Sequence, residues 1–251
     1  MKPGPQEFGL IGFPLEHSAS ALYFSNKFKR ERLDGFTYSL FPLPSADGIL
    51  PLISSLPHLQ GLNVTIPHKQ SIIPWLNYID PVAKEIGAVN TLLIRRSGKG
   101  FDLCGYNTDA EGFRLSLRPG FMHTHALILG TGGSSKAVEY SLKKMQLDVL
   151  KVSRTFRAPG IICYDDLSPE ILRKFTFIVN CTPAGMFPET ETSPQLPVGL
   201  LGPSHEVYDL IYNPSETKLL REARKAGAIT CNGMKMLELQ AELSFKIWMG
   251  R

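Results

Sequence analysis

The sequence has no long apolar run. Nowhere does an uncharged apolar stretch reach the ~20 residues that a membrane-spanning helix requires. Residues 1–6 hold two prolines where a secretory signal would begin its apolar core. We therefore expect no membrane partner and, by default, a cytoplasmic location.

Cysteine and histidine are also scarce. The four cysteines stand at positions 104, 163, 181 and 231, too far apart for a CxxC pair, and no histidine stands at metal-ligand spacing from them. This spacing indicates neither a zinc site nor a small disulfide framework. We predict no metal, and free, buried thiols in a reducing compartment.

An excess of charge of either sign is lacking too. Lys and Arg number 27 against 23 Asp and Glu, which leaves a net charge of +4. The basic clusters are short, at residues 27–30 and 95–96, and a solvated surface explains them as well as a nucleic-acid site does. We expect a small-molecule substrate and no nucleic-acid partner, and leave open whether the chain is a monomer or a homodimer.

The residues that are present favour a folded α/β protein. Hydrophobic residues make up 43% of the chain and charged residues 20%, which is typical of a globular fold. Over the first part of the chain, apolar strands alternate with helical segments, and this order predicts a mostly parallel sheet. The expected strands are residues 8–12, 36–41, 61–65, and a hairpin of 88–94 with 101–105; the expected helices are residues 20–32 and 46–55.

A second α/β region begins at residue 125. The apolar strand 125–129 runs into a glycine-rich turn and then a helix over 135–144, and further strands are expected at 149–153, 177–181 and 206–210. This order is typical of a doubly wound parallel sheet of the Rossmann type. We place one domain at residues 1–105, joined by a C-terminal helix over 234–251, and the other at 106–233. In that helix Met236, Leu237, Gln240 and Phe245 are expected to contact the first domain.

The glycine-rich turn is a candidate phosphate site. It keeps two glycines of the G-x-G-x-x-G pattern, follows an apolar strand and opens a helix, so its backbone N–H groups can face a pyrophosphate. An ordinary strand-to-helix turn is the alternative. The residues expected to bind the cofactor here are Gly130, Thr131, Gly132, Gly133 and Ser134.

The end of the following strand predicts which dinucleotide binds. An NAD site would have Asp or Glu there to accept from the ribose hydroxyls, whereas this chain has Ser153, Arg154 and Thr155. With Lys151 and Arg157 behind Arg154, the position should attract a 2′-phosphate. We predict NADP rather than NAD; the alternative is that Arg154 is only a solvated residue at a strand end.

Lys69 and Asp109 are the candidates for proton transfer. Lys69 ends the polar segment 63–69, and Asp109 ends the segment 107–109. A single lysine is usually a surface charge, and an aspartate after a threonine is usually a helix cap. Spacing alone therefore leaves open whether the two side chains meet.

Taken together, the motifs resemble those of the shikimate dehydrogenase family, whose members reduce 3-dehydroshikimate with NADPH on the route to aromatic amino acids. No single motif is decisive, but the motifs keep their order over nearly the whole chain. The matching segments are residues 17–20, 63–69, 87–91, 107–109 with Gly112, the turn at 130, 153–155, 180–183 with 185–186, Asp209 with Tyr212, Pro214 and Thr217, and Gly233, Met234, Met236, Leu237 and Gln240.

The resemblance implies a role for each matching residue. Lys69 and Asp109 match the catalytic pair, and Ser18 and Ser20 match the serines that hold the substrate carboxylate. The positions that match other residues around the substrate are Asn63, Thr65, Asn90, Tyr212 and Gln240. Thr182, Leu210 and Gly233 match positions near the nicotinamide, and the active site is expected between two domains that close, with a hinge near Tyr106 and Gly233.

Two alternatives stay open. One is a quinate/shikimate dehydrogenase of mixed specificity, against which the retained Ser20 weighs. The other is a non-catalytic NADP-sensing module, and the retention of both Lys69 and Asp109 weighs against it, because a sensor needs neither. His68, beside the lysine, is expected to be structural.

Overall fold

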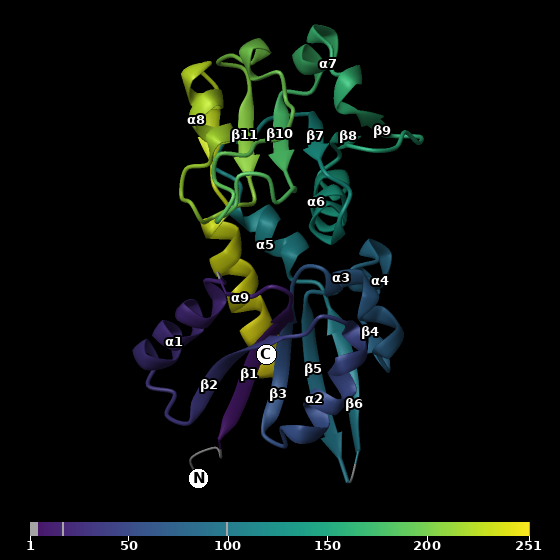
Figure 1. Cartoon of the computed structure of the whole chain (residues 1–251), viewed down its shortest axis with the longest axis vertical. Coiled ribbons are helices and arrows are strands. Elements are labelled where there is room, and N and C mark those ends of the chain that lie inside the picture. The colour runs from purple at the N-terminus through teal and green to yellow at the C-terminus, as the bar shows by residue number, and fades with distance from the viewer. Residues whose placement is uncertain (1–4, 17, 99, 251) are drawn as a thin grey trace. The chain divides into compact units, whose positions relative to one another are not determined.

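The computed structural model describes residues 5–16, 18–98 and 100–250 (Figure 1). His17, one of the residues that carry the family resemblance, lies outside them. The chain divides into two compact units, Met1–Asp109 with Gln240–Arg251, and Ala110–Leu239. The domain boundaries and roles assigned from the sequence stay predictions. No helix in the described ranges is both long and apolar enough to cross a membrane.

The first unit is built on a six-stranded sheet of order β2-β1-β3-β5-β6-β4. Its strands are β1 Gln6–Gly12, β2 Phe36–Pro42, β3 Leu59–Val64, β4 Tyr78–Ile79, β5 Thr91–Ser97 and β6 Gly100–Tyr106. β1 is parallel to β2 and β3, and β4 is parallel to β6. β5 is antiparallel to β3 and β6, as the predicted hairpin requires. β5 starts at Thr91 rather than residue 88, since Val89 N–H donates to the Lys69 carbonyl instead.

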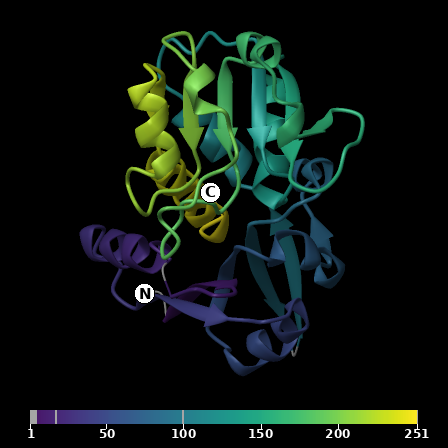
Figure 2. The ribbon, with the colours of Figure 1, turned by 45° about the horizontal axis from the view of Figure 1, so that its top comes forward.

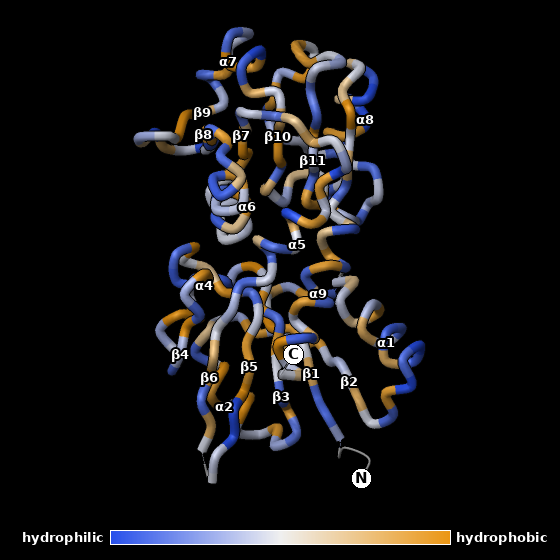
Figure 3. The backbone as a smooth tube through the Cα atoms, turned by 180° about the vertical axis from the view of Figure 1, so that it is seen from behind, coloured by the Kyte–Doolittle hydropathy of each residue, from blue (hydrophilic) through white to orange (hydrophobic). Residues whose placement is uncertain are grey.

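Helices cover this sheet on both faces, because its side chains alternate between two apolar clusters. Leu92 and Ile94 lie in one cluster with α2, and Leu93 lies against the other, which includes Phe24 of α1 and Trp248 of α9. The helices are α1 Ser20–Arg30, α2 Ile49–Ser55, α3 His68–Ser71, α4 Pro81–Ile86 and the last part of α9 Met234–Trp248. In Figure 3 much of β5 is coloured as hydrophobic.

Two predicted helices differ from the observed ones. α1 ends at Arg30 rather than residue 32, since Arg32 has a left-handed backbone with φ of 55°. The predicted helix 46–55 begins as a 3-10 turn, Ala46–Gly48, before α2.

Lys27 of α1 is buried, although its basic cluster suggested a solvated surface. Only 4% of its side chain is exposed, and Nζ lies 2.7 Å from Glu242 Oε2 on α9 and 2.7 Å from Glu31 Oε1. The ammonium also lies 4.6 Å from the centre of the Phe245 ring. This group therefore fixes α1 against the end of α9.

The second unit contains a six-stranded sheet of order β12-β11-β10-β7-β8-β9, in which all paired strands are parallel. Its strands are β7 His125–Leu129, β8 Asp148–Ser153, β9 Ile161–Cys163, β10 Phe177–Asn180, β11 Glu206–Asp209 and β12 Ile229–Cys231. Numbered within the unit, this is the Rossmann order 3-2-1-4-5-6. The order reverses between β7 and β10, where such sheets bind ligands.

Helices cover both faces of this sheet as well (Figures 1 and 2). Leu127 and Leu129 lie in a cluster with Leu172 of α7 and Leu219 of α8. On the opposite face Ile128 lies in a cluster with residues of α5 and α6. The helices are α5 Asp109–Ser116, α6 Gly133–Lys144, α7 Pro169–Lys174, α8 Lys218–Lys225 and the start of α9.

The expectation for the C-terminal helix was right for one residue and wrong for another. Phe245 lies in the aromatic cluster of the first unit, as predicted. Met236 instead lies in the core of the second unit, because α9 begins there and residues from Gln240 onward belong to the first unit.

Candidate functional site

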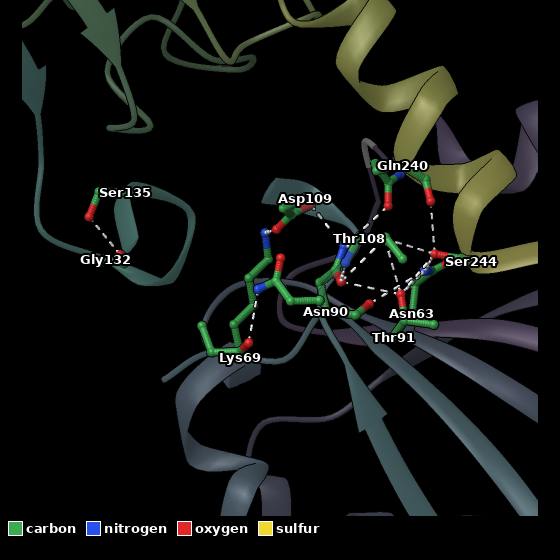
Figure 4. Close-up of polar contacts among 12 residues, drawn as sticks. Asn63, Lys69, Asn90, Thr91, Thr108, Asp109, Gly132, Ser135, Gln240 and Ser244 are labelled. Atoms are coloured by element: carbon green, nitrogen blue, oxygen red, sulfur yellow. Dashed lines mark hydrogen bonds and ion pairs between the residues drawn. The ribbon is translucent and has the colours of Figure 1, made fainter. Parts of the chain in front are cut away.

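Lys69 and Asp109 meet in the first unit. Lys69 lies in α3, just after β3, and Asp109 is the first residue of α5, just after β6. Lys69 Nζ lies 2.7 Å from Asp109 Oδ2, and the two side chains are 13% and 7% exposed (Figure 4). The pair is thus shielded from water.

Asn90 holds the other oxygen of the same carboxylate. Asn90 Nδ2 donates to Asp109 Oδ1 at 2.8 Å and to Thr108 Oγ1 at 2.9 Å. Asn90 Oδ1 accepts from the Thr108 backbone N–H at 2.7 Å, which fixes the orientation of the amide. Gln240 Oε1 lies 3.3 Å from the same Asn90 nitrogen. Asp109 is therefore held between a cation and an oriented amide.

Ser244 organises the buried hydroxyl groups beside this pair. Its hydroxyl has no exposed surface and lies 2.8 Å from Thr91 Oγ1 and 3.1 Å from Thr108 Oγ1. It accepts from Asn63 Nδ2 at 2.9 Å. Ser244 was not predicted from the sequence, where its position one helical turn after Gln240 was the only available signal.

The Asn63 amide forms hydrogen bonds within the protein. Besides donating to Ser244, it accepts at Oδ1 from the Tyr38 hydroxyl at 2.9 Å, and the residue is 5% exposed. The amide thus has a partner at each end. Its predicted contact with substrate stays a prediction.

The other predicted substrate residues come from the start of α1, the end of β3 and the second unit. Ser20 opens α1, and its backbone N–H donates to Ser18 Oγ at 3.3 Å. Thr65 follows β3 and is half-buried, and its backbone N–H donates to the Ile11 carbonyl. Tyr212 is half-buried and belongs to the second unit.

His68 is a structural residue, in agreement with the expectation. It is 2% exposed, and its Nε2 lies 2.6 Å from the Leu43 carbonyl. A carbonyl only accepts, so Nε2 carries the proton and His68 ties α3 to the segment after β2.

In the second unit, the glycine-rich turn joins β7 to α6 at the point where the strand order reverses. Gly130 has a φ of +106°, and a Cβ there would lie 3.1 Å from Thr182 Cγ2, so glycine is required. The α6 helix follows Gly132 without an acidic residue in its first turn, and Ser135 Oγ donates to the Gly132 carbonyl at 2.7 Å (Figure 4). Thr131, Gly133 and Ser134 complete the turn. The N–H groups at the start of a helix suit an anion.

Arg154 lies directly after β8 and is exposed. Burial raises the pKa of Tyr164 to about 12, and the positive charge of Arg154 opposes that rise. Ser153 Oγ accepts from the Thr155 N–H at 3.3 Å, which orders the chain around Arg154.

The two cations expected to support Arg154 are instead paired with carboxylates. Lys151 Nζ lies 2.6 Å from Glu139 Oε2, and Arg157 Nε lies 2.8 Å from Asp166 Oδ2. Carboxylates therefore offset the two charges that were expected to support Arg154. Among the described residues, Arg154 has no carboxylate within ion-pair distance. Its positive charge, just after the end of β8, is therefore not offset by an ion pair.

The residues expected near the nicotinamide follow β10 and β11. Thr182 follows β10, and Leu210 follows β11, where its N–H donates to the Asn180 carbonyl at 3.0 Å. A Cβ on Gly233 would lie 2.0 Å from the Leu210 carbonyl oxygen, so only glycine fits.

The cysteines are free thiols, and no group of His, Cys, Asp and Glu in the described ranges could hold a metal ion. Cys104 and Cys163 are buried as expected, whereas Cys181 and Cys231 are only partly buried.

A Rossmann-order sheet with a glycine-rich turn, together with a shielded lysine–carboxylate pair, defines the class of dinucleotide-dependent dehydrogenases. Comparison with known proteins gives the family. The family model described as "Shikimate dehydrogenase substrate binding domain" matches residues 10–92. A shikimate dehydrogenase (NADP+) of Methanococcus maripaludis is 38% identical over 97% of this chain and 91% of its own length. The chain belongs to the shikimate dehydrogenase family.

Solved structures agree with this assignment. A crystal structure of a shikimate dehydrogenase in complex with NADP+ has a TM-score of 0.85 and 35% identity, covering 98% of this chain and 91% of that one. The enzyme of Thermus thermophilus, in complex with NADP(H) and shikimate, has a TM-score of 0.83 and 32% identity, covering 98% and 94%. The predicted fold class, with two α/β units and a Rossmann-type sheet, is confirmed.

Proposed function

We propose that this chain is a shikimate dehydrogenase that reversibly reduces 3-dehydroshikimate to shikimate with NADPH. The observation that carries the proposal is the Lys69–Asp109 contact of 2.7 Å, shielded from water and held from the other side by Asn90. Relatives named shikimate dehydrogenase (NADP+) over nearly the full length of the chain support it. Reduction of a ketone needs a proton donor such as this lysine, whereas a sensing module does not.

The second unit fits NADP. A pyrophosphate commonly binds at a glycine-rich turn before a helix, at the point where the strand order reverses. The turn at Gly130, which has a positive φ and leads into α6, lies at such a point. No carboxylate follows β8, and Arg154 is the cation available to a 2′-phosphate. The residues proposed to hold NADP are Gly130, Thr131, Gly132, Gly133, Ser134, Ser153, Arg154, Thr155, Thr182, Leu210 and Gly233.

Lys69 carries the proton chemistry. Bound NADPH supplies the hydride that reduces a ketone to an alcohol. As charge develops on the ketone oxygen, the Lys69 ammonium donates a hydrogen bond to it and then the proton. Asp109 orients the ammonium through the 2.7 Å contact. In the reverse direction Lys69 accepts the proton of the alcohol.

The remaining polar residues are proposed to bind the substrate. Ser18 and Ser20 lie at the start of α1, where hydroxyl and backbone N–H donors suit a carboxylate. The residues proposed to contact its hydroxyl and carboxylate groups are Asn63, Thr65, Asn90, Tyr212 and Gln240. We also propose a cytoplasmic enzyme, monomeric or homodimeric, which sedimentation of the purified protein distinguishes.

The test is absorbance at the reduced-nicotinamide band after the purified protein is mixed with shikimate and NADP. Parallel reactions replace shikimate by quinate and NADP by NAD. We expect fast NADPH formation with shikimate and NADP only. Equal rates with quinate would indicate the mixed-specificity enzyme, and equal kcat/KM for NAD would overturn the cofactor assignment.

A further inference from the structure

Asp209 is a buried carboxylate in the second unit that the catalytic scheme does not use. It ends β11 and has no exposed surface. Its Oδ1 accepts from Asn180 Nδ2 at 2.9 Å and from the Ile211 N–H at 3.0 Å, and its Oδ2 accepts from the Thr217 hydroxyl at 2.7 Å. Among the described residues no cation acts on it. Burying a carboxylate without a cation costs free energy. The three hydrogen bonds that Asp209 accepts must offset this cost.

Each partner of Asp209 is a donor. The Ile211 N–H is a backbone group and can only donate. Thr217 Oγ1 accepts from the Leu220 N–H at 3.3 Å, which leaves its own proton for Asp209. The carboxylate therefore acts only as an acceptor, and Asn180 must present its NH2 group to it.

The orientation of Asn180 fixes the hydroxyl of Thr182. Asn180 Oδ1 accepts from the Thr182 N–H at 3.0 Å and from the Thr182 hydroxyl at 2.7 Å. The backbone N–H can only donate, so it agrees with the amide orientation that Asp209 imposes. The Thr182 proton thus points to Asn180, while the Ala184 N–H lies 3.3 Å from Thr182 Oγ1. One acceptor position on this hydroxyl remains.

Thr182 lies where a dinucleotide would bind. Asn180 pairs in register with Leu129 on one side and with Asp209 on the other, so β7, β10 and β11 end in one row. Thr182 follows this row and its methyl group lies against Gly130 of the glycine-rich turn. Its remaining acceptor position is therefore at the point where the strand order reverses.

We propose that Asp209 is a positioning residue of the cofactor site: through Asn180, it commits the Thr182 hydroxyl to accept a hydrogen bond from the bound dinucleotide. The donor is an N–H of the carboxamide or a ribose hydroxyl, since these are the donor groups of the nicotinamide half. The inference rests on the proposed function only in requiring that the second unit binds NADPH.

The experiment measures NADPH affinity by fluorescence titration without substrate. The variants are Thr182→Ser, which keeps the hydroxyl, Thr182→Val, which removes it, and Asp209→Asn alone and combined with each. We expect Thr182→Ser to bind like the parent and Thr182→Val to bind about three- to tenfold more weakly, as for one lost hydrogen bond. Asp209→Asn should weaken binding similarly in the parent and in Thr182→Ser, but add nothing in Thr182→Val.

Equal affinity of Thr182→Ser and Thr182→Val would overturn the inference. So would a loss from Asp209→Asn that is the same in all backgrounds, because that is the behaviour of a merely structural residue. If Asp209→Asn does not fold, Asn180→Ala in the same three backgrounds performs the same test. Since no substrate is present, a failed dehydrogenase assay would overturn the proposed function without deciding this inference.

Discussion

Lys69 Nζ and Asp109 Oδ2 lie 2.7 Å apart although 40 positions separate the two residues in the chain. Parallel and antiparallel strands of one sheet bring them together, since α3 follows β3 and α5 follows β6. The pair joins a proton donor to a carboxylate that orients it. This geometry makes the lysine useful mainly when negative charge develops on a substrate oxygen.

Replacing Lys69 by Ala should lower kcat by about 10²–10³-fold and leave KM for shikimate nearly unchanged, because the lost interaction is made mainly in the transition state. Steady-state kinetics measures both constants. Lys84→Ala, which removes an exposed lysine of α4, is the matched control and should behave like the parent. A rise in KM with unchanged kcat would instead make Lys69 a binding residue.

Replacing Arg154 by Ala should lower kcat/KM for NADP about tenfold or more and leave the value for NAD nearly unchanged, because only NADP carries the 2′-phosphate. The neighbouring Arg157→Ala is the control, since Arg157 already pairs with Asp166. If both variants lost NADP activity equally, the preference would come from overall positive charge rather than from Arg154.

The group around Lys27 should contribute to stability rather than to catalysis. Burial alone would raise the pKa of Glu242, but hydrogen bonds from Lys27 and Tyr23 hold it below its usual value. Glu242→Gln leaves the buried ammonium with weaker compensation and should cost about 1–2 kcal/mol of unfolding free energy. Urea unfolding measures the loss, and Glu238→Gln, at a half-buried residue of the same helix, is the control. Equal stability of the two variants would show that the pair is dispensable.

Asp209 should make stability depend on pH. Burial raises its pKa to about 6, against the opposing hydrogen bonds from Thr217, Ile211 and Asn180. The native protein therefore takes up this proton at higher pH than the unfolded chain, so stability is lost as pH rises from about 4 to about 6. Between pH 7 and pH 5 the parent should gain about 1 kcal/mol relative to Asp209→Asn. Urea unfolding at both pH values tests this, and a constant difference would contradict it.

The sequence predicted the strands and helices that are long enough to show a clear residue pattern. Strands such as 125–129 were found because they are apolar runs bounded by turn residues. The long helices were found from the helical spacing of their apolar residues. The shorter elements were not predicted, and most of them have too few residues to show a period: β4, β9, β12, α3, α4, α5, α7 and α8. The all-parallel order of the second sheet followed from its βα rhythm and the glycine turn at Gly130.

The site was predicted less fully, because its partners come from distant parts of the chain. Lys151 and Arg157 looked like support for Arg154, but the fold brings Glu139 and Asp166 to them. Ser244 is a serine inside an amphipathic helix, and only the fold shows that it contacts Asn63 and Thr91. Motifs identify residue types, whereas pairing depends on tertiary contacts.

The most direct test of the central claim is the loss of reduced-nicotinamide absorbance when the purified protein meets 3-dehydroshikimate and NADPH. We expect NADPH to be oxidised in step with the formation of an equal amount of shikimate. If the folded protein binds NADPH but oxidises none of it, the chain is an NADP-binding module and the proposed dehydrogenase activity is wrong.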